Sequence, residues 1–208
     1  MKHALLASVL LSGLLGSGAV FAAGEEVQGI KVNKGNGSAG EGNSVMLKGS
    51  PMPLKGEALK VGEPLPSAMV TAGNLGLVDI AKGDGKVRII SVVPSVDTPT
   101  CEAQTHQLSE KDRKLADQVE MVTISMDLPF AQRRYTKESG FKNVTFLSDY
   151  RGNAFGKGTG LLLKQSQLLA RAVLVVDKDN VIRHMQVMPD MSFLPDMQAA
   201  FKVARGLL

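Results

Sequence analysis

The sequence predicts an α/β fold in which helices flank a central mixed sheet. Through the middle of the chain, apolar runs of strand length alternate with polar segments of helix length. The last two apolar runs, by contrast, are joined by the tight turn at 177–180. Alternation of this kind is typical of parallel strands covered by helices, and the turn adds an antiparallel pair. The length suits one ordinary domain, which we place at 45–208.

The first part of the chain predicts little regular structure. Residues 23–44 are rich in Gly, Ser, Asn and Lys, and we expect a flexible N-terminal segment. Residues 45–54 alternate around a Gly-Ser-Pro turn and predict a β-hairpin. A Pro-rich connector at 61–66 then leads to short strands within 69–78.

The rest of the chain predicts regular elements in a clear order. Pro129 begins one helix, because its fixed φ suits the first helical position. A Gly-rich connection is expected at 152–160, since its Gly-Lys-Gly-Thr-Gly run lacks the spacing of a phosphate-binding loop. The expected strands are 86–93, 119–125, 144–147, 170–176 and 181–188, and the other expected helices are 102–116 and 196–207.

The N-terminus has the pattern of a secretory signal peptide at 1–22. Lys2 precedes an uncharged run of small and apolar residues, and polar residues begin at Gly24. Val20, Phe21 and Ala22 fit a signal-peptidase site, so we expect cleavage after Ala22 and export to a bacterial periplasm. A membrane anchor is the alternative, but no stop-transfer pattern follows the run. We therefore expect no membrane attachment after cleavage.

Charge and composition argue against nucleic acid as a partner. The chain has 24 Lys and Arg residues against 20 Asp and Glu residues, and the two signs are interleaved, as at 110–114. Aromatic residues make up 4% and tryptophan is absent. This pattern indicates solvated helix faces and no stacking platform for bases.

Cys101 is the only cysteine of the chain, and its position favours a reactive thiol. It lies between a predicted strand and a predicted helix, where unpaired backbone N–H groups and the helix dipole stabilise a thiolate. The alternative is a small buried apolar residue, the usual role of a lone cysteine. A turn that contains Pro94, Ser95, Thr98 and Thr100 is an unusual place for core filling, and we favour reactivity.

Three segments carry a resemblance to a known family. Residues 94–101 form a Pro-x-x-x-Thr-x-x-Cys motif, 125–134 read Ser-Met-Asp-Leu-Pro-Phe-Ala-Gln-Arg-Arg, and 169–177 read Leu-Ala-Arg-Ala-Val-Leu-Val-Val-Asp. Together they resemble the thiol peroxidase branch of the peroxiredoxins, and the similarity runs from about residue 45 to the end. The resemblance implies a thioredoxin fold with an N-terminal β-hairpin, no cofactor, and a possible homodimer.

The resemblance also implies a role for four residues. Cys101 would attack a hydroperoxide, Thr98 would orient thiolate and peroxide, Arg171 would supply a permanent positive charge, and Pro94 would shield the oxidised sulfur. Taken singly, Thr98 could be a helix N-cap and Arg171 part of a surface ion pair. Hydrogen peroxide and alkyl hydroperoxides are the implied substrates, with an apolar pocket expected at 128–130.

The chain departs from the family pattern at one position. Two-cysteine thiol peroxidases carry a resolving cysteine where Thr136 stands here. An intramolecular disulfide is therefore impossible, and the sulfenic acid of Cys101 must be reduced by an external thiol, from a thioredoxin-like protein or a small molecule. The alternative function is a non-enzymatic redox sensor or thiol-binding protein that forms mixed disulfides at Cys101.

Two further features have weaker functional readings. His106 follows Cys101 by five residues, about 140° around the predicted helix, which is a poor position for a Cys–His pair. Met185, Met188 and Met191 have a spacing that could hold Cu(I). We favour core packing for these methionines, because an odd separation on a strand sends two of them to opposite faces.

Overall fold

The computed structural model describes residues 25–110 and 113–208, so the expected signal peptide lies outside the described residues. A seven-stranded mixed sheet forms the centre, in the order β12-β11-β7-β8-β9-β5-β6. Its strands are β5 (Met69–Ala72), β6 (Leu77–Asp79), β7 (Val87–Val92), β8 (Val119–Ser125), β9 (Thr145–Ser148), β11 (Ala172–Val176) and β12 (Ile182–Val187). The helices are α1 (Pro99–Glu110), α2 (Arg113–Gln118), α3 (Pro129–Ser139), α4 (Ala154–Thr159) and α5 (Met197–Arg205).

The middle of the sheet is parallel and its two sides are antiparallel. Strand β8 pairs in parallel with both β7 and β9, whereas β11 runs antiparallel to β7 and β12 runs antiparallel to β11. All six residues of β7 are buried, as expected for a strand covered on both faces. The predicted central mixed sheet flanked by helices is therefore confirmed.

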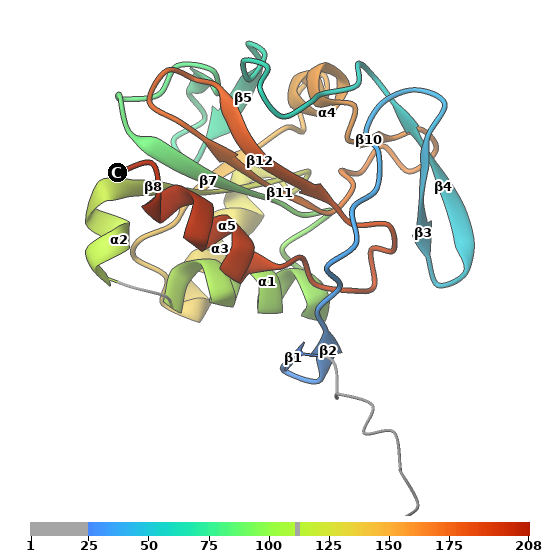
Figure 1. Ribbon diagram of the computed structural model, residues 1–208, viewed down its shortest axis with the longest axis horizontal. Helices are drawn as coiled ribbons and strands as arrows, with labels where there is room; N and C mark the ends of the chain where they lie inside the picture. The colour runs from blue at the N-terminus through green and yellow to red at the C-terminus, as the bar shows by residue number, and fades with distance from the viewer. Residues whose placement is uncertain (1–24, 111–112) are drawn as a thin grey trace, which may run out of the picture.

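One face of the sheet is covered by helices. Figure 1 shows α1, α2, α3 and α5 on the same side of the strands. Leu108 of α1 and Phe201 of α5 share a buried cluster with Ile89 of β7 and Val173 of β11. The N-terminus of α5 is capped by Asp196, whose carboxylate accepts a hydrogen bond from the backbone N–H of Ala199 at 3.0 Å.

The other face is covered by a second, smaller sheet and α4. Strands β3 (Ser44–Leu47) and β4 (Ser50–Lys55) form a hairpin, and β10 (Leu162–Leu163) pairs with β4. Their side chains and Phe155 of α4 pack on the central strands in the larger of two buried clusters. In Figure 1 the hairpin stands beside the sheet, on the side away from α2.

The predicted hairpin is confirmed, but its turn lies earlier than the Gly-Ser-Pro run. Lys48 and Gly49 join the two strands, with φ of 49° and 81°. Two consecutive positive φ angles are typical of the tight turn that matches strand twist, and Gly adopts this conformation at little cost. Ser50 and Pro51 belong to β4 and pair with Leu47 and Met46.

Two helical predictions need correction. The expected connection at 152–160 contains α4, a helix too short to be visible as periodicity. Its first turn is stabilised by the carboxylate of Asp149, which accepts hydrogen bonds from the N–H groups of Phe155 and Gly156. The helix predicted at 102–116 begins earlier, at Pro99, and its described residues lie in α1 up to Glu110 and in α2 from Arg113 to Gln118.

The segment expected to be flexible, as far as it is described, is docked on the domain. It forms the short strands β1 (Glu26–Val27) and β2 (Ile30–Lys31), and Asn33 then donates its backbone N–H to the carbonyl of Leu194. Farther on, the N–H of Gly37 bonds to the carbonyl of Val187. Among the described residues no helix is long and apolar enough to cross a membrane.

Candidate active site around Cys101

Cys101 is the third residue of α1 and is fully buried, with 0% of its surface exposed. The chain reaches it from the end of β7 through the loop at 93–98. Thr98 caps the helix: its Oγ1 accepts a hydrogen bond from the Cys101 N–H at 3.4 Å, and its carbonyl accepts one from Glu102 at 2.9 Å. Pro99 occupies the first helical position, where its missing N–H costs nothing. The thiol therefore sits at the positive end of α1.

Arg171 contacts the sulfur directly. Its Nη2 lies 3.4 Å from Sγ of Cys101, and its side chain is buried. The antiparallel pairing of β11 with β7 sets Ala172 opposite Val92, which places Arg171 beside the end of β7 from which the loop at 93–98 departs. A guanidinium remains charged when buried, so it is a fixed positive neighbour for a thiolate.

Two further hydrogen bonds hold the guanidinium in place. Nε donates to the carbonyl of Met191 at 2.9 Å, and Nη1 donates to Oε1 of Gln104 at 2.8 Å. Gln104, one turn after Cys101 on α1, donates its Nε2 to Ser91 Oγ at 2.9 Å and to the Ala172 carbonyl at 3.1 Å. Gln104 thus ties α1, β7 and β11 together around the charge. Nothing in the local sequence distinguishes this glutamine from others, so sequence reasoning missed it.

The carboxylate of Asp127 fixes the loop at 93–98, which we call the active loop. It accepts hydrogen bonds from Ser95 Oγ at 2.7 Å, from the Val96 N–H at 2.7 Å and from Ser125 Oγ at 2.6 Å. Asp127 belongs to one of the segments that carried the family resemblance, but its contacts depend on the parallel pairing of β7 and β8. A side chain from the end of β8 therefore fixes the loop that leaves β7.

The structure brings Thr98 and Arg171 each into contact with Cys101, while Pro94 lies half-buried at the start of the loop. The carbonyl of Pro94 accepts a hydrogen bond of 3.5 Å from the Met126 N–H. The hydroxyl of Thr98 caps α1, which agrees with its interpretation as a helix N-cap, while its role in orienting a peroxide stays a prediction. Arg171 is not part of a surface ion pair. The arrangement suits nucleophilic attack by sulfur beside a fixed cation.

A groove of about 460 Å³ lies beside the active loop, between α1 and α3. Thr98 and Pro99 line one end, and Tyr135 of α3 lines the other side. Burial raises the pKa of Tyr135 to about 12, and the nearby Glu102 and Cys101 add to the shift, so its hydroxyl is neutral at physiological pH. His106, on this groove, lies 3.6 Å from Glu102 and stacks edge-on against Phe141.

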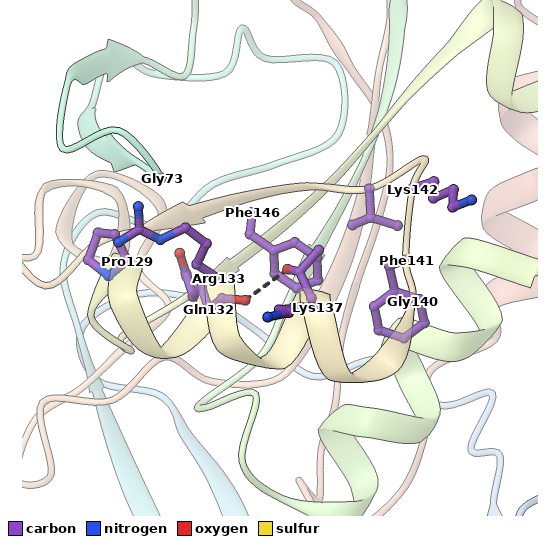
Figure 2. Close-up of a pocket in the computed structure, with 11 residues that line it drawn as sticks. Gly73, Pro129, Gln132, Arg133, Lys137, Gly140, Phe141, Lys142 and Phe146 are labelled. Carbon is purple, nitrogen blue, oxygen red and sulfur yellow. Dashed lines mark hydrogen bonds between the residues drawn. The ribbon is translucent and has the colours of Figure 1, made fainter.

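A larger groove, of about 590 Å³, lies along α3 and contains the position of the missing resolving cysteine. Thr136 lines it, with Oγ1 donating to the Gln132 carbonyl at 2.8 Å. Figure 2 shows Arg133, Lys137 and Lys142 around this groove, together with Phe141 and Phe146.

The apolar pocket expected at 128–130 does not form as one unit. Pro129 lines the larger groove, whereas Leu128 and Phe130 are 50% and 55% exposed. Leu128 is the N-cap of α3 and Phe130 is its second residue, and neither of them lines the groove.

The three methionines are packed in the interior. Met185 and Met191 belong to the larger core cluster, and Met188 is fully buried just after β12. Met191 also contributes its carbonyl to Arg171. These contacts agree with the packing interpretation that the sequence favoured.

Comparison with known proteins gives consistent matches over most of the chain. The Redoxin family matches residues 60–200. The thiol peroxidase of Halalkalibacterium halodurans is 40% identical over 165 residues, which cover 79% of this chain and 99% of that protein.

Solved structures match over the same part of the chain. A peroxiredoxin-like protein from Aquifex aeolicus is 33% identical, with a TM-score of 0.74, over 79% of this chain and 97% of the other. Thiol peroxidase from Chromobacterium violaceum has a TM-score of 0.69 at 23% identity, over 80% of this chain and 97% of that one, and supports the fold.

Proposed function

The chain belongs to the Redoxin family and is a thiol-dependent peroxidase of the peroxiredoxin type, and we propose that it works with Cys101 as its single peroxidatic cysteine. The observation that carries this proposal is the contact between the buried guanidinium of Arg171 and Sγ of Cys101, at 3.4 Å. The substrates we propose are hydrogen peroxide and alkyl hydroperoxides.

In the first step the Cys101 thiolate attacks the terminal oxygen of the hydroperoxide. A sulfur–oxygen bond forms and the oxygen–oxygen bond breaks. The leaving group is an alkoxide, or hydroxide from hydrogen peroxide, and it takes a proton from solvent to become an alcohol or water. Sulfur is oxidised to a sulfenic acid and the peroxide is reduced. Arg171 stabilises the thiolate before attack and the negative charge on the peroxide oxygens during it. The cap made by Thr98 keeps the sulfur at the positive end of α1.

In the second step an external thiol reduces the sulfenic acid. The chain has one cysteine, so its own thiol cannot resolve the oxidised form. A first thiol condenses with the sulfenic acid to a mixed disulfide and water. A second thiol then attacks this disulfide, which releases Cys101 as a thiol and a disulfide of the reductant. Thioredoxin-like proteins and small thiols are the classes of reductant that we propose.

We further propose that this reaction takes place after export. The N-terminal pattern at 1–22 and its small residues before position 23 support a signal peptide and a periplasmic location. A homodimer is proposed from the family resemblance.

The deciding experiment is a single-turnover reaction of the reduced mature chain with hydrogen peroxide and with cumene hydroperoxide. Dimedone trapping followed by intact mass would detect the sulfenic acid. We expect oxidation far faster than that of free cysteine, none in Cys101→Ser, and turnover when a reducing thiol is added. Oxidation no faster than free cysteine would overturn the peroxidase proposal. Fast oxidation without turnover by any thiol would favour the redox sensor instead.

A further inference from the structure

The N-terminal segment that precedes the family match makes direct contact with the part of the chain that holds Arg171. Residues 30–37, which we call the strap, lie along β12 and the loop at 188–194. In Figure 1 the blue chain runs upward past the red loop between β12 and α5. The strap lies before residue 60, where the Redoxin match begins.

The strap binds the loop through its backbone. Leu194 donates its N–H to the carbonyl of Lys31, and Asn33 donates its N–H to the carbonyl of Leu194, both at 2.9 Å. The two bonds form an isolated parallel bridge between Val32 and Leu194. The far end of the loop is therefore paired with a segment from outside the sheet.

Two side chains fasten the strap to the edge of β12. Asn36 donates Nδ2 to the Met185 carbonyl at 3.0 Å and accepts the Val187 N–H at 2.8 Å, which satisfies two backbone groups on the outer edge of the sheet. Gln186 is 4% exposed, and its Nε2 donates to the carbonyls of Asn33 and Gly35, each at 2.8 Å.

The loop in turn holds the guanidinium. Met191, inside the loop, accepts the Nε–H of Arg171 at 2.9 Å, and Met188 donates its N–H to the Arg171 carbonyl at 2.9 Å. From the other side, Met46 of β3 exchanges hydrogen bonds with Pro189 and Met191. The loop at 188–194 is therefore hydrogen-bonded to the hairpin on one side and to the strap on the other. The Met191 carbonyl, which accepts the hydrogen bond from Arg171, belongs to this loop.

We propose that the strap is a positioning element for Arg171, and that Asn36 is one of the two side chains that fasten it. The inference rests on the proposed function, because its effect is read through the reaction of Cys101 with peroxide. Without the strap the Met191 carbonyl has more freedom, and the guanidinium spends less time at 3.4 Å from Sγ.

The test compares Asn36→Ala in the full mature chain with the matched control Asn74→Ala. Asn36 and Asn74 are both exposed, but Asn74 only accepts the Gly76 N–H within the β5–β6 turn. Hydrogen exchange of the Leu194 amide reports whether the strap has loosened. If the Leu194 amide stays protected in Asn36→Ala, the double variant with Gln186→Leu is used. The second substitution removes the two hydrogen bonds that the Gln186 side chain donates to the strap.

We expect loosened variants to react with hydrogen peroxide about threefold to tenfold more slowly, while the control is unchanged. The rate with iodoacetamide, which also needs the thiolate but has no peroxide oxygen for Arg171 to bind, should fall less than the rate with hydrogen peroxide. In an Arg171→Lys background the effect of Asn36→Ala on the peroxide rate should shrink to less than about twofold.

Each outcome separates the two proposals. A loosened Leu194 amide with an unchanged peroxide rate would overturn the strap proposal and leave the peroxidase intact. An equal loss in the Arg171→Lys background would also overturn it, since the effect would then bypass Arg171. A wild-type chain that reacts no faster than free cysteine would instead remove the proposed function itself.

Discussion

Arg171 and Cys101 are 70 residues apart in the chain, yet Nη2 of one lies 3.4 Å from Sγ of the other in a fully buried site. A buried guanidinium is costly unless each of its edges has a partner. Here the partners are the sulfur, the Gln104 side chain and the Met191 carbonyl. The same contacts that satisfy the charge therefore fix its position relative to the thiol.

The first prediction concerns the geometry of that charge. Arg171→Lys keeps a positive charge but cannot satisfy the sulfur, Gln104 and Met191 together. We expect the second-order rate with hydrogen peroxide to fall by about 10-fold to 100-fold, the equivalent of one charge-assisted hydrogen bond. Stopped-flow oxidation of the reduced protein would measure it. Arg205→Lys, at the exposed end of α5, is the control, and equal rates for both variants would remove Arg171 from the mechanism.

The second prediction contrasts two buried glutamines on α1. Gln104 has partners for both ends of its amide, whereas Nε2 of Gln107 is buried without a hydrogen-bond partner among the described residues. Gln104→Leu should lower the free energy of unfolding by about 1–3 kcal/mol, because it leaves Arg171 and Ser91 unsatisfied. Gln107→Leu should be neutral or stabilising. Urea unfolding distinguishes them, and similar losses in both would argue against the network.

The third prediction concerns the loop that carries Pro94 and Thr98. Asp127→Asn replaces one carboxylate oxygen with an NH₂ group, which is a donor. The N–H and O–H groups that donate to the carboxylate would then face another donor. We expect a loss of about 1–3 kcal/mol in stability and a slower reaction with peroxide. Asp97→Asn lies on the same loop but is exposed, and should change neither quantity. If the Asp127 variant kept the wild-type peroxide rate, the clamp would have no part in catalysis.

The fourth prediction is a pH dependence of stability from His184. Burial lowers the pKa of His184 below its usual 6.5, and the opposing charge of Asp196 offsets part of this shift. The unfolded chain therefore binds a proton at a higher pH than the folded chain does, so stability should fall as the pH drops below about 6.5. His184→Gln should flatten this part of the curve. Urea midpoints between pH 8 and pH 5 would test it, and parallel curves for variant and wild type would contradict it.

Much of the fold follows from local patterns. Strand β8 has the bounds predicted for it, β7 lies within the predicted 86–93, and α3 begins at Pro129 as expected. These elements are buried or start at a residue of fixed geometry, so their signals are strong in a single sequence. By contrast, α4 is six residues long and depends on Asp149, which gives no periodic signal of its own.

The candidate site divides in the same way. Cys101 and Thr98 lie within one short motif, and the turn chemistry of that motif is by itself enough to indicate a reactive thiol. Arg171 needed the family resemblance, because nothing local shows which arginine a distant loop will contact. Gln104, Asp127 and the strap contacts at Asn36 were not anticipated. Their hydrogen bonds join segments far apart in the chain, such as the 67 residues between Gln104 and Arg171.

Composition, cysteine count and strand–helix order were thus sufficient for the fold class, and they predict the nucleophile and the need for an external reductant. The chain has one thiol, and no arrangement of the backbone can supply a second. Only the folded chain decides what surrounds that thiol: which carbonyl aims the guanidinium, which carboxylate holds the loop, and that the Gly- and Asn-rich lead lies against β12. The physical reason is that local propensities depend on a few neighbouring residues. The partners of a buried charge, by contrast, come from segments that are distant in the chain and that only the folded sheet brings together.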